Sequence, residues 1–264
     1  MPRDVAATVI RNIDLGHGNL LLDLDAAPLA EATVPGQFFM IGVPGADVLL
    51  RRPFSVCGLP GTFPESGPRS VQILYKIVGR GTALLGALKP GTVLQVLGPL
   101  GKGFEPREDG ALPVHVAGGI GIAPFPALAA ASRRPPALFY GARHRGDLPL
   151  LPWFRERCAR VVVTTEDGSE GVRGLVTGPL REFLAAGPGP VRVSACGPTP
   201  MLKAVAELAA EFEVPCDLSL EAPMACGFGV CLGCVVPVRA EDGGVRYERC
   251  CVEGPVMPAS RLAW

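Results

Sequence analysis

The sequence predicts a multidomain β plus α/β fold, with an N-terminal antiparallel β-barrel, a parallel-sheet α/β domain and a small C-terminal module. Short β-rich segments separated by Gly/Pro turns fill roughly the first hundred positions, a rhythm typical of barrels and sandwiches. From about residue 112 to 212, apolar strands alternate with helical stretches, which is typical of a parallel sheet covered on both faces. Five of the nine cysteines then crowd into residues 226–251. A tail this short cannot form its own hydrophobic core, so we expect it to depend on a metal.

The barrel strands are recognised by apolar and β-branched residues between turn residues. We expect them at residues 6–10, 20–24, 37–43, 71–78 and 93–97. A short helix is predicted at residues 82–87, closed by Lys89-Pro90-Gly91, and residues 61–67 are predicted to form a loop. We place this first domain at residues 1–106.

The second domain is expected over residues 107–215, where the spacing changes to that of βα units. Its strands are predicted at residues 113–117, 137–140, 161–164 and 191–195, and its helices at residues 123–132, 178–186 and 199–212. Val214-Pro215 ends this part, and the cysteine-rich module takes residues 216–264.

The bulk composition excludes several classes of function. The 25 basic and 25 acidic residues balance, so the charge indicates neither a nucleic-acid partner nor a membrane-surface anchor. Gly and Pro interrupt every apolar run, so none approaches the roughly 20 residues of a membrane span. Asp4, Arg11 and Asp14 interrupt the segment where a signal peptide would need an apolar run. We therefore expect a cytoplasmic protein, in which thiols stay reduced and clustered cysteines indicate metal.

The cysteine spacing in the tail is the strongest motif. Cys226, Cys231 and Cys234 follow the pattern C-x4-C-x2-C, and a further cysteine stands at position 250 or 251. This spacing is typical of plant-type 2Fe-2S clusters. The glycines between the cysteines allow main-chain N–H groups to turn toward the sulfurs.

Zinc is the alternative metal for these cysteines, and bystander thiols are a third interpretation. A zinc ribbon usually carries two C-x2-C pairs, and only one is present. The fourth ligand stays open on spacing alone, because Cys250 and Cys251 are adjacent. Consecutive residues of an extended segment point to opposite sides, so we expect only one of them to reach the iron.

Two short motifs in the first domain are suited to a phosphate group. Arg51 to Ser55 follows an apolar segment that we expect to be a strand, and it would offer a guanidinium and a hydroxyl to a pyrophosphate. A surface arginine at a strand end is the alternative. In the second motif, Leu74-Tyr75-Lys76 is followed by Gly79-Arg80-Gly81-Thr82, a Gly turn that opens a helix with free N–H groups.

The second domain carries a glycine loop between a predicted strand and a predicted helix. The loop reads Gly119-Ile120-Gly121-Ile122-Ala123-Pro124, so proline stands where the Rossmann fingerprint has Gly or Ala. Cys196-Gly197-Pro198 follows another strand, and a buried small apolar role is the alternative for Cys196.

Acidic residues after the strand at 161–164 indicate which nucleotide the domain prefers. Glu166 and Asp167 stand there, and a carboxylate accepts a hydrogen bond from the ribose 2'-OH and repels a 2'-phosphate. This favours NAD over NADP. Arg143 and Arg145 count against that interpretation unless they are solvated loop charges.

Taken in order, these motifs resemble the ferredoxin-reductase superfamily and, within it, the electron transfer subunits of NAD-dependent dihydroorotate dehydrogenase B. The resemblance runs over essentially the whole chain. It rests on RPFS at 52–55, LYK at 74–76, GRGT at 79–82, GPLGKGF at 98–104, AGGIGIAP at 117–124, ACGPTPM at 195–201, EAPMACGFGVCLGC from residue 221 and CVEGP from residue 251.

The resemblance assigns site residues. It implies that FAD is lined by Arg52, Pro53, Phe54, Ser55, Leu74, Tyr75, Lys76, Gly79, Gly81 and Thr82. The superfamily uses G-x-G-x-x-P at the glycine loop, so NAD would contact Gly118, Gly119, Gly121, Pro124, Asp167, Gly197 and Pro198, with Cys196 beside the nicotinamide as the catalytic candidate. In the family the last cluster cysteine precedes a Gly-Pro pair by two residues, which assigns Cys251 as the fourth ligand with Cys226, Cys231 and Cys234. Relatives tend to carry an apolar residue where this chain has Cys250.

The resemblance also implies a function and a partner. A separate FMN-containing catalytic subunit would oxidise dihydroorotate to orotate, and the electrons would pass through the 2Fe-2S cluster and FAD to NAD, in pyrimidine (UMP) biosynthesis. We expect a heterotetramer of two catalytic and two electron transfer subunits. One alternative keeps the cofactors and makes the chain a reductase subunit of a hydrogenase or of a ferredoxin-NAD(P) transhydrogenase. Another is a non-enzymatic, zinc-stabilised binding module, against which the intact RPFS, GRGT and AGGIGIAP motifs argue.

Overall fold

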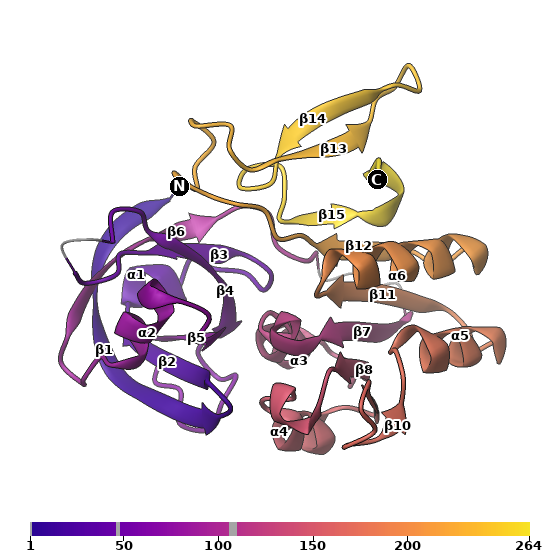
Figure 1. The fold of residues 1–264 in the computed structure, drawn as a ribbon, viewed down its shortest axis with the longest axis horizontal. Helices are drawn as coiled ribbons and strands as arrows, with labels where there is room; N and C mark the ends of the chain where they lie inside the picture. The colour runs from indigo at the N-terminus through magenta and orange to yellow at the C-terminus, as the bar shows by residue number, and fades with distance from the viewer. Residues whose placement is uncertain (1, 46–47, 106–109) are drawn as a thin grey trace.

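The structure is a computed structural model, and it describes residues 2–45, 48–105 and 110–264. It consists of a barrel at one end, an α/β layer at the other and a C-terminal segment that reaches across both (Figure 1). This is the predicted fold class. The expected limit between the first two domains, at residues 106 and 107, lies outside the described residues.

Six antiparallel strands close the barrel, because apolar residues alternate along them between an inner and an outer face. Around the barrel they run in the order β1 (Arg3–Gly16), β2 (Asn19–Asp25), β5 (Ser70–Lys76), β4 (Arg52–Gly58), β3 (Phe38–Ile41) and β6 (Val93–Leu100). Two short helices, α1 (Ala27–Ala30) and α2 (Arg80–Gly86), connect them.

One element of the barrel differs from the prediction. The sequence places Arg52 to Ser55 after an apolar strand, but residues 48–50 form no strand and Leu49 is 94% exposed. Instead β4 begins at Arg52, and Pro53 pairs with Met40 of β3. Proline lacks the N–H of a strand residue, so this segment carries little strand signal in the sequence.

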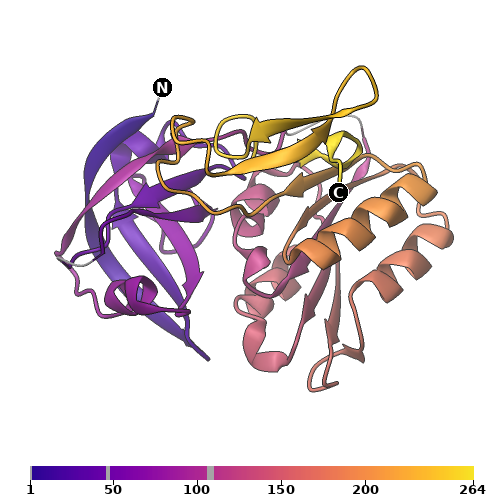
Figure 2. The ribbon, with the colours of Figure 1, turned by 45° about the horizontal axis from the view of Figure 1, so that its top comes forward.

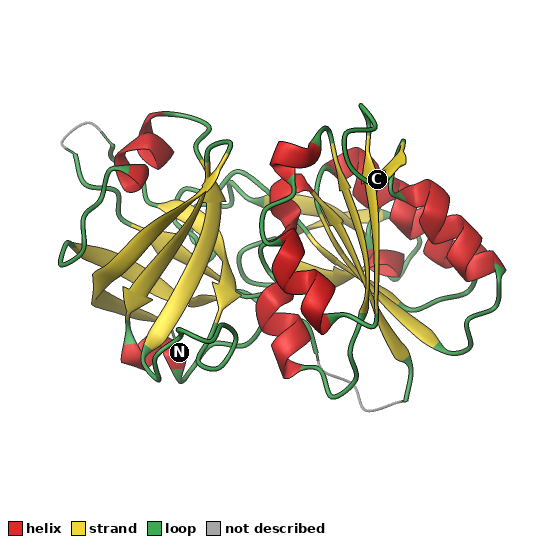
Figure 3. Cartoon of the chain, turned by 90° about the horizontal axis from the view of Figure 1, so that it is seen from below, coloured by secondary structure: helices red, strands yellow, loops and turns green. Residues whose placement is uncertain are grey.

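The second layer is a seven-stranded sheet with helices on both faces (Figure 3). Its strands run in the order β10 (Val172–Arg173), β9 (Arg160–Thr165), β8 (Ala137–Ala142), β7 (Leu112–Gly118), β11 (Val191–Cys196), β12 (Cys216–Ser219) and β15 (Val256–Pro258). All pair in parallel except β15, which lies antiparallel to β12. The helices are η1 (Gly119–Ile122), α3 (Phe125–Ala131), η2 (Arg145–Asp147), α4 (Leu151–Arg157), α5 (Thr177–Ala185) and α6 (Thr199–Glu211).

The C-terminal segment is joined to both other parts. Figure 2 shows it crossing from the barrel to the sheet. It consists of the cysteine loop, the ribbon of β13 (Val235–Arg239) and β14 (Val245–Arg249), the sheet strand β15 and the short helix η3 (Ala259–Arg261). The expected domain limit at 215 and 216 therefore falls at the start of β12, within the sheet that β15 completes, and the three domain ranges stay a prediction.

Apolar side chains connect the parts into shared cores. Phe38, Met40 and Leu100 of the barrel belong to the same buried cluster as Cys234 and Cys251 of the tail and the core of the sheet. A second shared cluster joins barrel residues such as Leu74 with the helices α3 and α4. Among the described residues, no helix is long and apolar enough to span a membrane.

Burial of His115 makes the stability of this fold depend on pH. The ring lies in β7, 1% exposed, stacked on Phe125 with 4.9 Å between ring centroids. Burial lowers the pKa of His115 from 6.5 to about 3. The unfolded chain therefore binds a proton between these values that the folded protein does not, and the free energy of unfolding falls as the pH falls below about 6.5.

We expect this contribution to reach about 2 kcal/mol at pH 5, from roughly 1.4 kcal/mol per pH unit. The substitution His115→Phe should remove it, because phenylalanine has no proton to bind. Urea unfolding at pH 7 and pH 5 measures the difference. If the free energy of unfolding fell equally in wild type and in His115→Phe between pH 7 and pH 5, His115 would not be the group that titrates.

Candidate functional site

The cysteine loop turns main-chain N–H groups toward its first thiols. Loss of solvent raises the pKa of Cys226, but hydrogen bonds from the main chain of Cys231, Phe228 and Val230 and from the Cys231 side chain outweigh it and lower the pKa to about 6. The N–H of Gly233 points to Cys231 Sγ at 3.5 Å. Such a loop stabilises negative charge on sulfur, which metal-bound thiolates carry.

The second pair of thiols lies deeper. Cys234 and Cys251 are each 2% exposed, and their side chains contact one another. Cys250 is completely buried and its Sγ faces Leu220 O at 3.8 Å. The two adjacent cysteines thus point in different directions, although they lie in a turn and not in an extended segment.

The four thiols therefore form two pairs, 226 with 231 and 234 with 251. Within the described ranges, no three Cys, His, Asp or Glu side chains converge as a single metal ion would require. Two pairs of thiols suit a group with two metal centres that takes two ligands at each. The donor set fits a 2Fe-2S cluster better than it fits one zinc ion.

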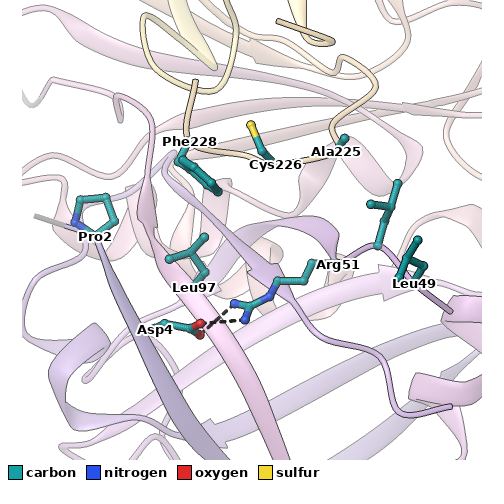
Figure 4. A pocket seen from close by; sticks show the side chains of 9 residues that line it. Pro2, Asp4, Leu49, Arg51, Leu97, Ala225, Cys226 and Phe228 are labelled. Carbon is teal, nitrogen blue, oxygen red and sulfur yellow. Dashed lines mark hydrogen bonds and ion pairs between the residues drawn. The ribbon is translucent and has the colours of Figure 1, made fainter. Parts of the chain in front are cut away.

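A cavity of about 570 Å³ separates the cysteine loop from the edge of the barrel (Figure 4). Cys226 and Phe228 line it from the loop. Across the cavity, Arg51 donates to both carboxylate oxygens of Asp4, at 2.8 and 2.7 Å. The adjacent Arg52 does not take part in this ion pair, and its Nη1 donates to Leu50 O at 2.5 Å.

Arg52 lies against the first turn of α2. A Cβ added to Gly81 would come within 3.3 Å of Arg52 Nε, so glycine leaves room for the guanidinium. The Thr82 hydroxyl accepts hydrogen bonds from the N–H groups of Val78 and Gly79, at 2.9 and 3.1 Å, which fixes the turn. A guanidinium held beside a glycine-lined helix start fits a phosphate group.

The motif at the end of β5 divides between two faces. Leu74 packs into the apolar cluster shared with the second layer. Tyr75 points into the barrel and donates to Asn12 Oδ1 at 3.1 Å. Lys76 forms an ion pair with Asp147 of η2, so it ties the barrel to the second layer.

The glycine loop and the Cys196 loop meet at the point where the strand order of the sheet reverses. From β7 the chain goes to β8, β9 and β10 in one direction, and β11 and β12 lie on the other side. Ligands of doubly wound sheets bind at this point, beyond the carboxyl ends of the strands. A Cβ on Gly121 would lie 2.7 Å from Gly197 Cα, and one on Gly118 would lie 2.7 Å from Pro198 Cδ. Only glycine allows the two loops to come this close, and they do so at the edge of the sheet where doubly wound proteins bind dinucleotides.

Cys196, the last residue of β11, carries a neutral thiol. It is 3% exposed, and burial together with the negative charge of Glu221 raises its pKa to about 12, against a hydrogen bond with Ser219. Glu221 follows β12 and lies at the carboxyl edge of the sheet, and no motif in the sequence marks it. Partial loss of solvent raises the pKa of Glu221 as well.

Asp167 lies after β9 at the same edge of the sheet. Its Oδ1 accepts hydrogen bonds from Ser169 Oγ at 2.6 Å and from Ser169 N at 2.9 Å, and these lower its pKa. Its own N–H donates to Arg143 O at 3.2 Å. The structure therefore places Asp167, which favours NAD, beside the loop of Arg143, which counts against it, so the preference for NAD stays a prediction.

Known proteins resemble this chain over most of its length. The family model of the iron-sulfur cluster binding domain of dihydroorotate dehydrogenase B matches residues 221–263. The dihydroorotate dehydrogenase B (NAD(+)) electron transfer subunit of Caldanaerobacter subterraneus subsp. tengcongensis is 43% identical over 86% of either chain. That of Desulforamulus reducens is 35% identical over 92% of either chain. A solved NADH-dependent reduced ferredoxin-NADP oxidoreductase, studied for flavin-based electron bifurcation, is 27% identical with a TM-score of 0.84, over 98% of this chain and 90% of its own.

The raised pKa of Cys196 predicts its reactivity. In cluster-free, reduced protein at pH 8, we expect iodoacetamide to leave Cys196 unmodified while the exposed Cys231 is alkylated, because only a small fraction of Cys196 is thiolate far below its pKa. Mass spectrometry of peptides after a short exposure measures both sites. Unfolding in urea should make Cys196 reactive. Modification of Cys196 at the rate of Cys231 in the folded protein would contradict the burial of this thiol.

Proposed function

The chain belongs to the family of electron transfer subunits of dihydroorotate dehydrogenase B (NAD(+)), and from this membership we propose that it carries electrons from dihydroorotate to NAD. The electrons would leave an FMN-containing dihydroorotate dehydrogenase catalytic subunit and pass through a 2Fe-2S cluster and FAD in this chain, in pyrimidine (UMP) biosynthesis. One observation carries the proposal: Cys234 and Cys251 share a buried cluster with residues of the barrel and of the sheet, so a group held by the paired thiols would lie where the three parts of the chain meet.

The residues of the chain would hold three groups, which are FAD, the 2Fe-2S cluster and the nicotinamide nucleotide. Bound FAD would exchange a hydride with the nicotinamide and single electrons with the cluster. Arg52, Gly81 and the turn fixed by Thr82 would hold its phosphates, and the outer face of β4 would carry its ring. The complete set we propose for FAD is Arg52, Pro53, Phe54, Ser55, Leu74, Tyr75, Lys76, Gly79, Gly81 and Thr82, with Tyr75 contributing through its main chain.

The carboxyl edge of the sheet, at the glycine loop and the Cys196 loop, would take the nucleotide. Gly118, Gly119, Gly121 and Pro124 would face its pyrophosphate, and Gly197 and Pro198 its nicotinamide half. Cys196 would lie beside the nicotinamide as a neutral, space-filling group, since its thiol stays protonated at physiological pH. Asp167 would accept from the ribose 2'-OH, and its negative charge favours NAD over NADP.

The partner follows from the family, because electron transfer subunits act with a catalytic subunit. We propose an assembly of two catalytic and two electron transfer subunits in the cytoplasm. The exposed apolar side chains around the cysteine loop, among them Phe228 and Val230, would face the catalytic subunit.

Reconstitution tests the function. Protein purified without oxygen should contain FAD, iron and inorganic sulfide, and its mixture with the FMN-containing subunit and dihydroorotate should reduce NAD, seen as absorbance of NADH at 340 nm. Neither subunit alone should form NADH from dihydroorotate and NAD. Failure of the fully loaded mixture to form NADH would refute the dihydroorotate function.

A second candidate keeps the cofactors and changes the electron donor. The structural similarity to the NADH-dependent reduced ferredoxin-NADP oxidoreductase, over nearly the whole chain, favours a reductase subunit of a ferredoxin-NAD(P) transhydrogenase or a hydrogenase. The same loaded protein, offered reduced ferredoxin in place of dihydroorotate and the FMN subunit, separates the two candidates.

The different directions of Cys250 and Cys251 predict which of them binds iron. The substitution Cys251→Ser should remove most of the cluster, because a hydroxyl is a poor ligand for iron that thiolates hold. Cys250→Ser is the matched control: it should keep the cluster while lowering stability by roughly 1–3 kcal/mol, the cost of a buried hydroxyl without a good partner. Iron and sulfide analysis with visible spectra checks both. Loss of the cluster in Cys250→Ser alone would reverse the assignment.

A further inference from the structure

Met40 lies between the cysteine loop and the strand proposed to carry the flavin. It is in the middle of β3 and fully buried. On one side its cross-strand neighbour is Pro53 of β4, and on the other it is Leu97 of β6. Cross-strand neighbours point to the same face, so Met40 and Pro53 share the outer face of the barrel. Ile41, the next residue, points into the barrel.

The cysteine loop rests directly on this side chain. A Cβ on Gly227 would collide with Met40 Cγ and come within 2.9 Å of Met40 Sδ. Gly227 adjoins Cys226, and Met40 belongs to the same apolar cluster as Cys234 and Cys251. Gly227 has a φ of +80°, so the loop turns at the point of contact. Met40 thus packs under the turn that follows Cys226 and lies one strand spacing, about 5 Å, from Pro53.

A second contact fixes the far end of the cysteine module on the same strands. The N–H of Lys102 donates to Gly254 O at 2.5 Å, and Gln37 donates to Gly101 O at 2.8 Å. The Lys102 bond ties the chain after Cys251 to the segment that follows β6, and the Gln37 bond holds that segment on the barrel. The Met40 contact supports the loop before Cys231, so each thiol pair has its own support on the barrel.

We propose that Met40 is a positioning residue for electron transfer, whose packing under Gly227 sets the separation between the cluster and the flavin. The inference rests on the proposed function, because it needs both groups in place. The packing of Met40 under Gly227, however, involves only residues of this chain. An unbranched thioether fills the irregular gap between a strand and a glycine turn, where a smaller side chain would leave a void and let the loop move.

Two substitutions and a matched control test the role. Met40→Ala should slow the reduction of the cluster after mixing with NADH by more than twofold, because a cluster that moves away from the flavin would receive electrons more slowly. In this reaction NADH would give a hydride to the flavin and become NAD, one of the two electrons would pass to the cluster, and the other would stay on the flavin. Met40→Leu, which keeps the volume, should restore the rate. Ile41→Ala removes a similar volume from the same strand on the opposite face, and it should leave the rate per bound flavin unchanged.

Hydrogen exchange of cluster-free protein gives a readout that needs no cofactor. In Met40→Ala the amides of residues 225–229 should exchange faster than in wild type, and in Ile41→Ala they should not. Transfer of electrons from NADH to ferricyanide through the flavin should stay within twofold of wild type in all variants. Met40 and Ile41 lie in β3 of the barrel and not in the loops proposed to bind the nucleotide.

The outcomes separate this inference from the function on which it rests. Wild-type protein without iron, sulfide or flavin would refute the proposed function. With both groups loaded, a wild-type rate of cluster reduction in Met40→Ala would overturn the role of Met40. So would an equal slowing in Ile41→Ala, or a failure of Met40→Leu to recover the rate.

Discussion

The contact of the C-terminal segment with both other parts of the chain is the constraint on which the rest of the structure depends. The tail is too short to form a core, and its ribbon of β13 and β14 has only two strands. It gains a fixed position by placing apolar side chains in the cluster that Phe38, Met40 and Leu100 form outside the barrel. It also contributes β15 to the sheet. Barrel and sheet are held at a fixed spacing by the same segment that carries the cysteines.

Close packing against the main chain of glycine gives each part of the site its chemistry. Glycine allows the cysteine loop to rest on the Met40 side chain, the Arg52 guanidinium to lie over α2 and the glycine loop to touch the Cys196 loop. An added methyl group would overlap the neighbouring group at Gly227 and Gly121, and at Gly81 it would press on Arg52. The thiols illustrate the electrostatic counterpart: main-chain N–H groups lower the pKa of Cys226, whereas burial raises that of Cys196. Two cysteines of one chain thus differ greatly in the charge they carry at neutral pH.

The sequence was sufficient for the fold class and for most of the elements, because the alternation of strands and helices in the second layer and the Gly/Pro rhythm of the first are local patterns. It failed at β4, where proline removes the strand signal, and it could not show that β12 and β15 would share a sheet across the cysteine module. Long-range pairing leaves no local trace in the pattern of residues. For the same reason Glu221, Asp147 and Met40 escaped notice. Each is an ordinary residue in the sequence, and its place depends on a partner far along the chain.

The position of β15 has a consequence for the making of the protein. Val256–Pro258 follows the cysteine loop and its ribbon in the sequence, yet it covers the edge of β12. Proteins fold from the N-terminus as they are synthesised, so the barrel is complete while this edge is still bare. Until β15 has been made, the sheet presents unpaired N–H and C=O groups along β12, the kind of edge to which another chain can add. The same segment that carries the cysteines therefore also protects the sheet against adding a strand from another molecule.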